Sequence, residues 1–456
     1  MSATPSPIAG FAARLSLLFL ALVAGAAQAT APVAIANKAI LDTGATVALS
    51  APAIAVDPSH NVHITALGSA PGSLDTCKSG GHLCNVYYLL VSQAGKVLIK
   101  PSQINSSSPG KHGHPQIALT STGKAVITWG AGRSGCCDGP SEFLRYALVD
   151  PSKQGTLNGS ALKPAALAVP ETEVGNAEGS KHALVLDSKN IAYVVRSAVG
   201  RRGTDPLRFL KFDPATGNVL HAESDIASTG ALGANSPSIA LDSKGNLHVV
   251  YGAADLGDDS PAGYTMLDSD GNVLIGTTQL DDAVPGIHPH VQKQHLALII
   301  GANDIVNIVY GDKRNTPDAG HYNDNRVGAT GGTTIYTRLD PSKAIHNGNP
   351  SNMATLRVGS DIEIPGFWYG RAFMAGDKFI HVIGGVGKTG SLAHVAFDPK
   401  NGTIILQPVI HTGATLNGVD YGPKFVAGAQ NEVVWSESVP NGTTLRLVMA
   451  PINSFY

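Results

Sequence analysis

The sequence is poor in charged residues and in long apolar runs. Of its 456 residues only 14% are charged, and the formal net charge is −2. A general nucleic-acid or membrane-surface binder needs a basic excess, so neither class is expected. Beyond the N-terminal segment no stretch approaches the ~20 apolar residues that a spanning helix needs, and helical periodicity is not sustained. These absences favour an all-β chain without a membrane span.

The N-terminal segment has the pattern of a secretory signal peptide. Arg14 precedes the apolar run LSLLFLALVAGAA, and Ala27-Gln28-Ala29 supplies a small-x-small cleavage pattern. We therefore predict a signal peptide over residues 1–29 and one domain over residues 30–456, secreted or periplasmic. Because no cysteine lies near the cleavage point, a lipoprotein anchor is not expected.

Cysteine is also scarce. The 4 cysteines fall in two short stretches, DTCKSGGHLC with Cys77 and Cys84, and GRSGCCDGP with Cys136 and Cys137. Export makes disulfides the expectation, and three connectivities are open. One connectivity pairs Cys77 with Cys84 and Cys136 with Cys137. The other two connect the first stretch to the second by disulfides, and we favour these. A soft-metal site on the thiolates is the alternative.

What the sequence does have is glycine (52), proline (28) and a repeat. Each copy is an apolar run, a polar turn and a second apolar run. The clearest copies are PAIAVDPSHNVHITA (52–66), PQIALTSTGKAVITW (115–129), HALVLDSKNIAYVVR (182–196) and PSIALDSKGNLHVVY (237–251), and looser ones end at Tyr310, Gly384 and Trp435. A second hairpin follows each copy, so the unit has four strands. Repeated seven times, this unit predicts a seven-bladed β-propeller of four-stranded blades.

The ends of the chain predict how the ring closes. The seventh unit stops after its third strand, and ATVALS (45–50) precedes the first unit like an unpaired fourth strand. Joining the two ends would remove the exposed edges of an open β-array. We therefore predict a propeller closed by an N-terminal strand at residues 45–50.

The repeat also separates two faces of the ring. The loops entering the first strand and leaving the second share one side, which we call the loop face, and the turn between these strands lies on the other, the turn face. Cationic, aromatic and imidazole side chains concentrate on the loop face, which favours an anionic ligand. The candidate catalytic residues are His114, Arg196 and Tyr251. The candidate substrate-binding residues are Trp129, Arg133, Lys181, His290, Tyr310, Arg314, His321, Tyr322, Tyr369, Arg371 and Tyr421. Packing at the rim or between blades is the alternative for each.

Three other features allow a site but favour structure. His63, His248 and His381 share one strand position, which indicates packing between blades rather than catalysis. The run HPHVQKQH (288–295) lacks a third matched ligand for zinc, and DSDGN (268–272) is typical of a β-turn rather than of a calcium loop. We therefore predict no cofactor and no metal centre, with a structural divalent cation as the open alternative. The loop at 312–332 is long enough to be functional.

The motif P-x-h-A-h-D-S-x-G-N-h-H-h-h-Y, seen at 237–251, resembles the sialidase-like, BNR-type propellers of secreted carbohydrate-active proteins. The Asp box of sialidases, S-x-D-x-G-x-T-W, is absent. Ulvan-lyase-like polysaccharide lyases are the nearer functional analogy. Such lyases neutralise a uronate carboxylate with Arg or His and use His or Tyr as base and acid. The resemblance thus implies these roles for His114, Arg196 and Tyr251.

The leading hypothesis is a monomeric, secreted polysaccharide lyase that cleaves an anionic, uronate-containing polysaccharide by β-elimination. It needs preorganised cations for the developing charge and a His or Tyr that moves the proton. The second hypothesis is a non-catalytic exported propeller that binds glycan or protein. The third is a glycoside hydrolase, for which Asp312 and Glu437 are the candidate carboxylates.

Overall fold

The computed structural model describes most of the chain. The described residues are 33–35, 37–41, 48–69, 84–106, 111–132, 143–176, 181–197, 206–226, 229, 234–253, 262–280, 296–312, 333–344, 353–365, 368–386, 391–412, 426–429, 431–438 and 445–456. Among these, no helix is long and apolar enough to cross a membrane.

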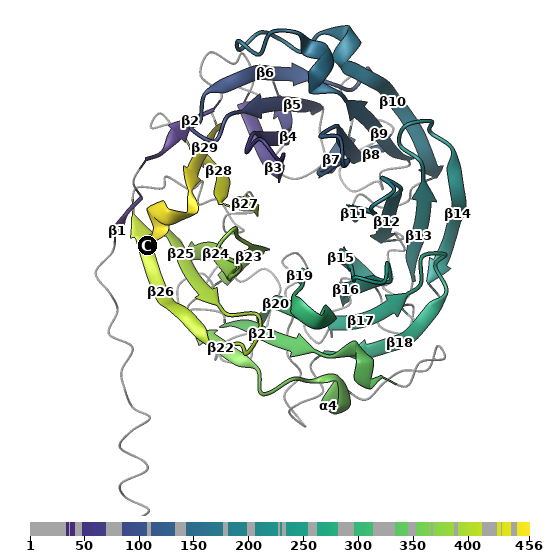
Figure 1. Ribbon diagram of the computed structural model, residues 1–456, viewed down its shortest axis with the longest axis vertical. Helices are drawn as coiled ribbons and strands as arrows, with labels where there is room; N and C mark the ends of the chain where they lie inside the picture. The colour runs from purple at the N-terminus through teal and green to yellow at the C-terminus, as the bar shows by residue number, and fades with distance from the viewer. Residues whose placement is uncertain are drawn as a thin grey trace, which may run out of the picture.

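Seven four-stranded sheets stand in a ring, with the first strand of each sheet nearest the axis (Figure 1). Blades one to three contain β3 (Ala48–Val56), β4 (Val62–Ser69), β5 (Asn85–Val91), β6 (Val97–Gln103), β7 (Lys111–Leu119), β8 (Ala125–Gly132), β9 (Phe143–Val149), β10 (Leu167–Asn176), β11 (His182–Leu186), β12 (Ala192–Ser197), β13 (Leu207–Phe212) and β14 (Val219–Ile226). Blades four and five contain β15 (Ala234–Leu241), β16 (Leu247–Ala253), β17 (Ala262–Leu267), β18 (Val273–Gln279), β19 (Ala297–Ile300), β20 (Val306–Asp312), β21 (Thr333–Leu339) and β22 (Ile362–Pro365).

Blades six and seven contain β23 (Trp368–Met374), β24 (Ile380–Val386), β25 (Ser391–Phe397), β26 (Ile404–Thr412), β27 (Val426–Ala429), β28 (Glu432–Ser438) and β29 (Leu445–Pro451). The described helices are short: η1 (Pro151–Gln154), η2 (Pro164–Ala166), η4 (Ala302–Asp304), η5 (Pro341–Lys343), α4 (Met353–Leu356) and η7 (Ile452–Phe455). The predicted seven-bladed propeller is confirmed.

The turns of the repeat fold as their residue types require. In blade four, Asp242 accepts hydrogen bonds on Oδ1 from the Asn246 backbone N–H at 2.8 Å, and Gly245 takes a φ of 82°. That left-handed conformation strains residues with a Cβ, which is why glycine stands there. The turn of blade one is built alike, with Asp57 accepting from the Asn61 N–H at 2.8 Å.

The ring closes through a different segment from the predicted one. Residues 48–50 of the predicted closing strand belong to β3, the innermost strand of blade one. The fourth strand of blade seven is instead β2 (Ala39–Ile40), which pairs antiparallel with β29. A further strand, β1 (Val33–Ala34), pairs parallel with β26 on the outside of blade six. An N-terminal strand therefore closes the ring, but the assignment to 45–50 was wrong, because the inner strand extends beyond the repeat motif.

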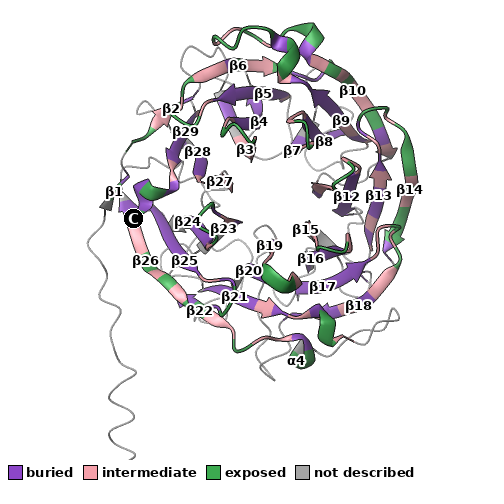
Figure 2. Cartoon of the chain, in the orientation of Figure 1, coloured by how far each residue is buried: buried purple, intermediate pink, exposed green. Residues whose placement is uncertain are grey.

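The core lies between neighbouring blades. Each of seven clusters of buried apolar residues joins side chains of adjacent sheets, such as Val250 and Tyr264 of blade four with Ile308 and Tyr310 of blade five. Figure 2 shows the same distribution, with buried residues on the middle strands and exposed ones on outer strands such as β14. The faces of the sheets are thus buried between blades. The loops, the turns and the edges of the inner strands remain available to bind a ligand.

Candidate functional site

The seven inner strands carry no carboxylate. β3, β7, β11, β15, β19, β23 and β27 read ALSAPAIAV, KHGHPQIAL, HALVL, ANSPSIAL, ALII, WYGRAFM and VAGA. Their ionisable residues are Lys111, Arg371, Tyr369, His112, His114 and His182. The residues of the inner strands are therefore cationic or neutral as a set, although the whole chain has a net charge of −2.

Arg371 stands out by its register. It pairs with Ile383 in β24, three residues before the last pair of the hairpin, Met374 with Ile380. The same register place in blades one to five holds Ala53, Gln116, Ala183, Ser238 and Ala297. Blade six is the one among these six that places a formal charge there.

The side chain of Arg371 is half-buried and lacks a described counter-ion. Burial alone lowers the pKa of its guanidinium. By contrast, Arg145 is paired with Glu171 at 2.7 Å, and Arg446 with Glu437 at 3.0 Å. A desolvated cation without a carboxylate is costly, so it marks a candidate anion-binding position.

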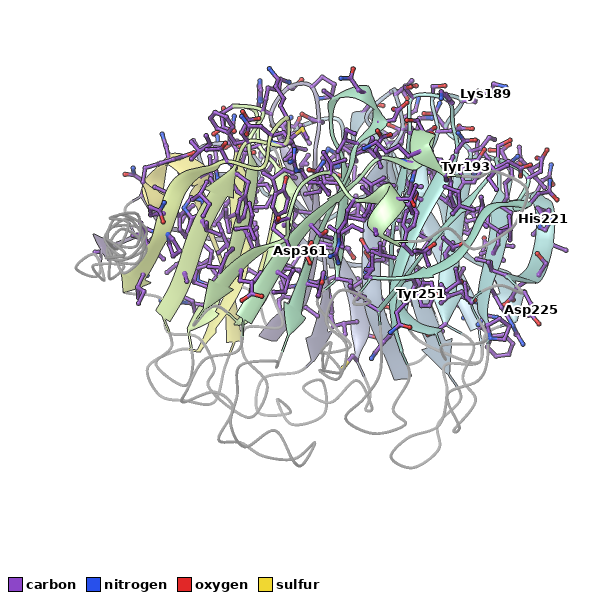
Figure 3. All side chains as sticks on the ribbon, turned by 90° about the horizontal axis from the view of Figure 1, so that it is seen from below. Lys189, Tyr193, His221, Asp225, Tyr251 and Asp361 are labelled. Carbon is purple, nitrogen blue, oxygen red and sulfur yellow. The ribbon has the colours of Figure 1, made fainter. Side chains whose placement is uncertain are left out.

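Arg196, a candidate catalytic residue, lies inside blade three. It is 1% exposed, and its guanidinium forms an ion pair with Glu223 of β14. Arg208 approaches the same carboxylate at 3.5 Å and donates through Nε to Asp225 at 3.1 Å. In Figure 3, Asp225 lies on the side of the ring opposite Lys189 of the β11–β12 turn. Arg196 thus belongs to a network of ion pairs at the loop face. Its partner Glu223 was not among the residues predicted from the sequence.

Tyr251, the second candidate, is fully buried at the end of β16. Its hydroxyl lies 2.8 Å from Thr277 Oγ1 in β18, and burial raises its pKa well above the ordinary value. A Cβ on Gly263 would collide with its ring, so the neighbouring strand needs glycine to make room for this side chain. Tyr251 lies toward the loop face in Figure 3, but within the packed blade.

The third candidate, His114, lies within β7 by its backbone, and its side chain is outside the described residues. Tyr369 lies in β23 in the same way. The structure therefore does not test whether His114 meets Arg196 or Tyr251. Six further candidates fall wholly outside the described residues: Arg133, His290, Arg314, His321, Tyr322 and Tyr421.

The remaining candidates are placed as follows. Trp129 and Tyr310 are buried, 0% and 1% exposed, in the second strands of blades two and five, where they pack between blades. Lys181 precedes β11 and is half-buried, and its carbonyl accepts from the Ser197 N–H at 3.0 Å. Beside it, His182 Nε2 lies 2.9 Å from Thr128 Oγ1 of blade two. Arg371 is thus the described candidate that combines partial exposure with an uncompensated charge.

The shared histidine position is structural. His248 is fully buried, with Nε2 3.4 Å from Asp242 Oδ2 and Nδ1 2.8 Å from the Tyr264 hydroxyl. Blade one repeats this arrangement with Asp57, His63 and Tyr88. Each histidine joins the turn to the third strand of its own blade, so the contact is within the blade rather than between blades.

Two alternative chemistries gain no support from the described residues. Among them, no group of three or more His, Cys, Asp or Glu side chains could hold a metal ion. Glu437, one carboxylate of the hydrolase hypothesis, is 0% exposed and paired with Lys38 and Arg446. The side chain of the other, Asp312, is outside the described residues, as are 288–295, Cys77, Cys136 and Cys137. Cys84 is buried, and no described cysteine is free.

Comparison with known proteins finds distant structural likeness and no family. No protein-family model and no curated protein matches the chain. Solved structures similar to it include a PL25 ulvan lyase, at 9% identity and a TM-score of 0.49, covering 88% of this chain and 94% of the lyase. An exo-1,5-alpha-L-arabinanase from a bovine ruminal metagenomic library shows 11% identity and a TM-score of 0.31 over 65% and 95% of the two chains. The hydrazine synthase of Kuenenia stuttgartiensis shows 13% identity and a TM-score of 0.47 over 88% and 95%. Such distant likeness carries no argument about activity.

Proposed function

We propose that this chain is an exported carbohydrate-active propeller, of the sialidase-like type, that binds an anionic, uronate-containing polysaccharide at its loop face. The supporting observation is that the seven inner strands carry Lys111, Arg371 and three histidines without one carboxylate. An excess of cationic over acidic residues raises the local concentration of an anionic ligand. Gln116 of the inner strand β7 is half-buried, so this strand is not fully covered by packing.

The reaction proposed for this ligand is β-elimination. A base removes the proton next to the uronate carboxylate, the bond to the leaving oxygen breaks, and a carbon–carbon double bond forms as that oxygen is protonated. Cations must stabilise the negative charge that develops on the carboxylate. Histidine is the residue suited to move the proton near neutral pH. We assign that role to His114 on β7 and the neutralising role to cations of the loop face.

The test is a set of uronate-containing polysaccharides incubated with the protein, followed by the ultraviolet absorbance of the unsaturated product. We expect absorbance to rise for at least one glycan and His114→Ala to abolish the rise. Tyr251→Phe is the second variant, since it removes only the hydroxyl that contacts Thr277. No rise with any glycan, or a rise that neither substitution reduces, would contradict the lyase proposal.

The second candidate function is non-catalytic binding of an anionic glycan. It is favoured by one observation: Arg196 and Tyr251 are buried and already engaged, with Glu223 and Thr277. Direct binding measured by calorimetry, without formation of an unsaturated product, would identify this function. Both candidates predict an exported monomer without a cofactor, with its four cysteines paired as disulfides. Thiol labelling of the unreduced, denatured protein tests the pairing, and any labelled cysteine contradicts it.

A further inference from the structure

Arg371 points toward the seam between blades six and seven. Alternation along β23 places Arg371 and Phe373 on the same side of the sheet. Phe373 belongs to the core cluster that contains Val433 and Trp435 of blade seven. In blade four, the register equivalent Ser238 likewise faces the next blade, where its Oγ accepts from the Leu298 N–H at 3.2 Å. The Arg371 side chain therefore lies at the inner end of the six–seven interface.

No described carboxylate of these two blades is left to neutralise it. Asp377 holds His381 at 3.0 Å and Asp398 accepts from the Lys400 N–H at 2.9 Å, both in hairpin turns. Glu432 accepts from the Asn431 N–H at 3.1 Å at the turn-face end of β28. Both Glu437 oxygens are occupied by cations of the outer part of the blade, Lys38 and Arg446. Each acid is engaged away from the axis.

The surroundings of Arg371 suit an oxyanion better than a structural ion pair. The guanidinium has five N–H donors, and it matches the geometry of carboxylate and sulfate groups. Burial removes water from the guanidinium. This loss of hydration lowers the pKa of Arg371 and strengthens its attraction for an incoming anion. The inner strands contribute no acid that would compete with such a ligand.

We infer that Arg371 binds one carboxylate or sulfate group of an anionic ligand at the inner seam between blades six and seven. That the group belongs to a polysaccharide rests on the proposed function; that the seam binds an oxyanion does not. Arg371 makes this contact through charge-assisted hydrogen bonds, and a neutral sugar lacks the group that pairs with it.

The test uses two small probes at constant ionic strength, inorganic sulfate and glucuronate, with calorimetric titration of the full chain. Arg371→Gln should weaken binding about 10- to 100-fold, the range of a lost charge-assisted hydrogen bond. Arg371→Lys keeps the charge but loses the planar guanidinium. Its affinity for both probes should lie between those of the unaltered protein and Arg371→Gln. Arg338→Gln is the matched control, because Arg338 pairs with Asn307 near the turn face and its guanidinium donates to the Lys400 and Val358 carbonyls. It should bind both probes like the unaltered protein.

Thermal unfolding provides a second test where the affinity for the probes is low. Without anions, Arg371→Gln should unfold at a higher temperature than the unaltered protein, because it removes an uncompensated, desolvated charge. Adding sulfate should then stabilise the unaltered protein more than this variant. Equal binding by Arg371→Gln and the unaltered protein, or no saturable binding of either probe, overturns the inference. Probe binding that depends on Arg371, together with no glycan binding, would overturn the proposed function alone. Glycan cleavage unaffected by Arg371→Gln would overturn the inference alone.

Discussion

Acid should destabilise this protein through the histidine stack of blade six. His381, His394 and His411 lie on the adjacent strands β24, β25 and β26, and each is 0% exposed. His394 Nδ1 donates to the Phe455 carbonyl at 3.1 Å, and its Nε2 lies 2.9 Å from His381 Nδ1. Burial lowers its pKa to about 3, with smaller effects from the neighbouring histidines.

The size of the effect follows from proton linkage. Unfolding returns His394 to a pKa near 6.5, so between pH 6.5 and pH 3 the unfolded chain binds a proton that the folded chain does not. Stability from this group is therefore full above pH 6.5 and is lost as the pH falls. Going from pH 7.5 to pH 5 should cost about 2 kcal/mol, with a slope of about 1 kcal/mol per pH unit around pH 5. Burial lowers the pKa of His381 as well, which adds in the same direction.

The assay is urea unfolding at several pH values between 7.5 and 5 for the unaltered protein and His394→Gln. Glutamine retains a donor for the Phe455 carbonyl but does not titrate, so the variant should lose about 2 kcal/mol less over this range. His60→Asn is the control, since His60 is exposed in a turn with a φ of 61°, which asparagine tolerates. It should keep the slope of the unaltered protein. If His394→Gln loses stability as steeply as the unaltered protein, the reasoning is refuted.

Three other predictions concern closure, a buried ion network and a turn, all measured by urea unfolding at pH 7.5. Leu41→Ala should cost about 2–5 kcal/mol, because Leu41 is fully buried beside the closing strand; a cost below that range would argue against closure by β2. Glu437→Gln should cost about 2–3 kcal/mol, because it leaves the cations of Lys38 and Arg446 without their carboxylate. Lys38→Met should cost less than about 1 kcal/mol, because the Lys38 side chain is 28% exposed. Equal costs for the two variants would contradict the network. Gly245→Ala should cost about 1 kcal/mol through its φ of 82° alone, since nothing lies within 4 Å of the added Cβ; a neutral effect would contradict that conformation.

The propeller could be predicted because each blade is a local pattern. The alternation of apolar residues sets the strands, and residues such as Asp242 and Gly245 set the turns by bonding their own backbone. Neither depends on distant parts of the chain. Closure was harder to predict: β2 has two residues, Ala39–Ile40, and gains its partner only when β29 arrives from the other end of the sequence.

The candidate site was predictable as a region and less so residue by residue. Repeat alignment located the loop face and included Arg371 among its cations. Whether a cation on that face is free or paired depends on strands that meet only in the folded blade. The sequence of β12 does not reveal that Arg196 is neutralised by Glu223 of β14, nor that Thr277 of β18 receives the Tyr251 hydroxyl.

The sequence by itself therefore determined the number of blades and the two faces, because these follow from short-range periodicity and composition. Only the tertiary structure decided which segment closes the ring and which charges are compensated. Ion pairing and burial are properties of side chains brought together from separate strands. For that reason two arginines that the sequence places on the same face differ in role. Arg196 is paired within its blade, whereas Arg371 is a candidate anion-binding residue.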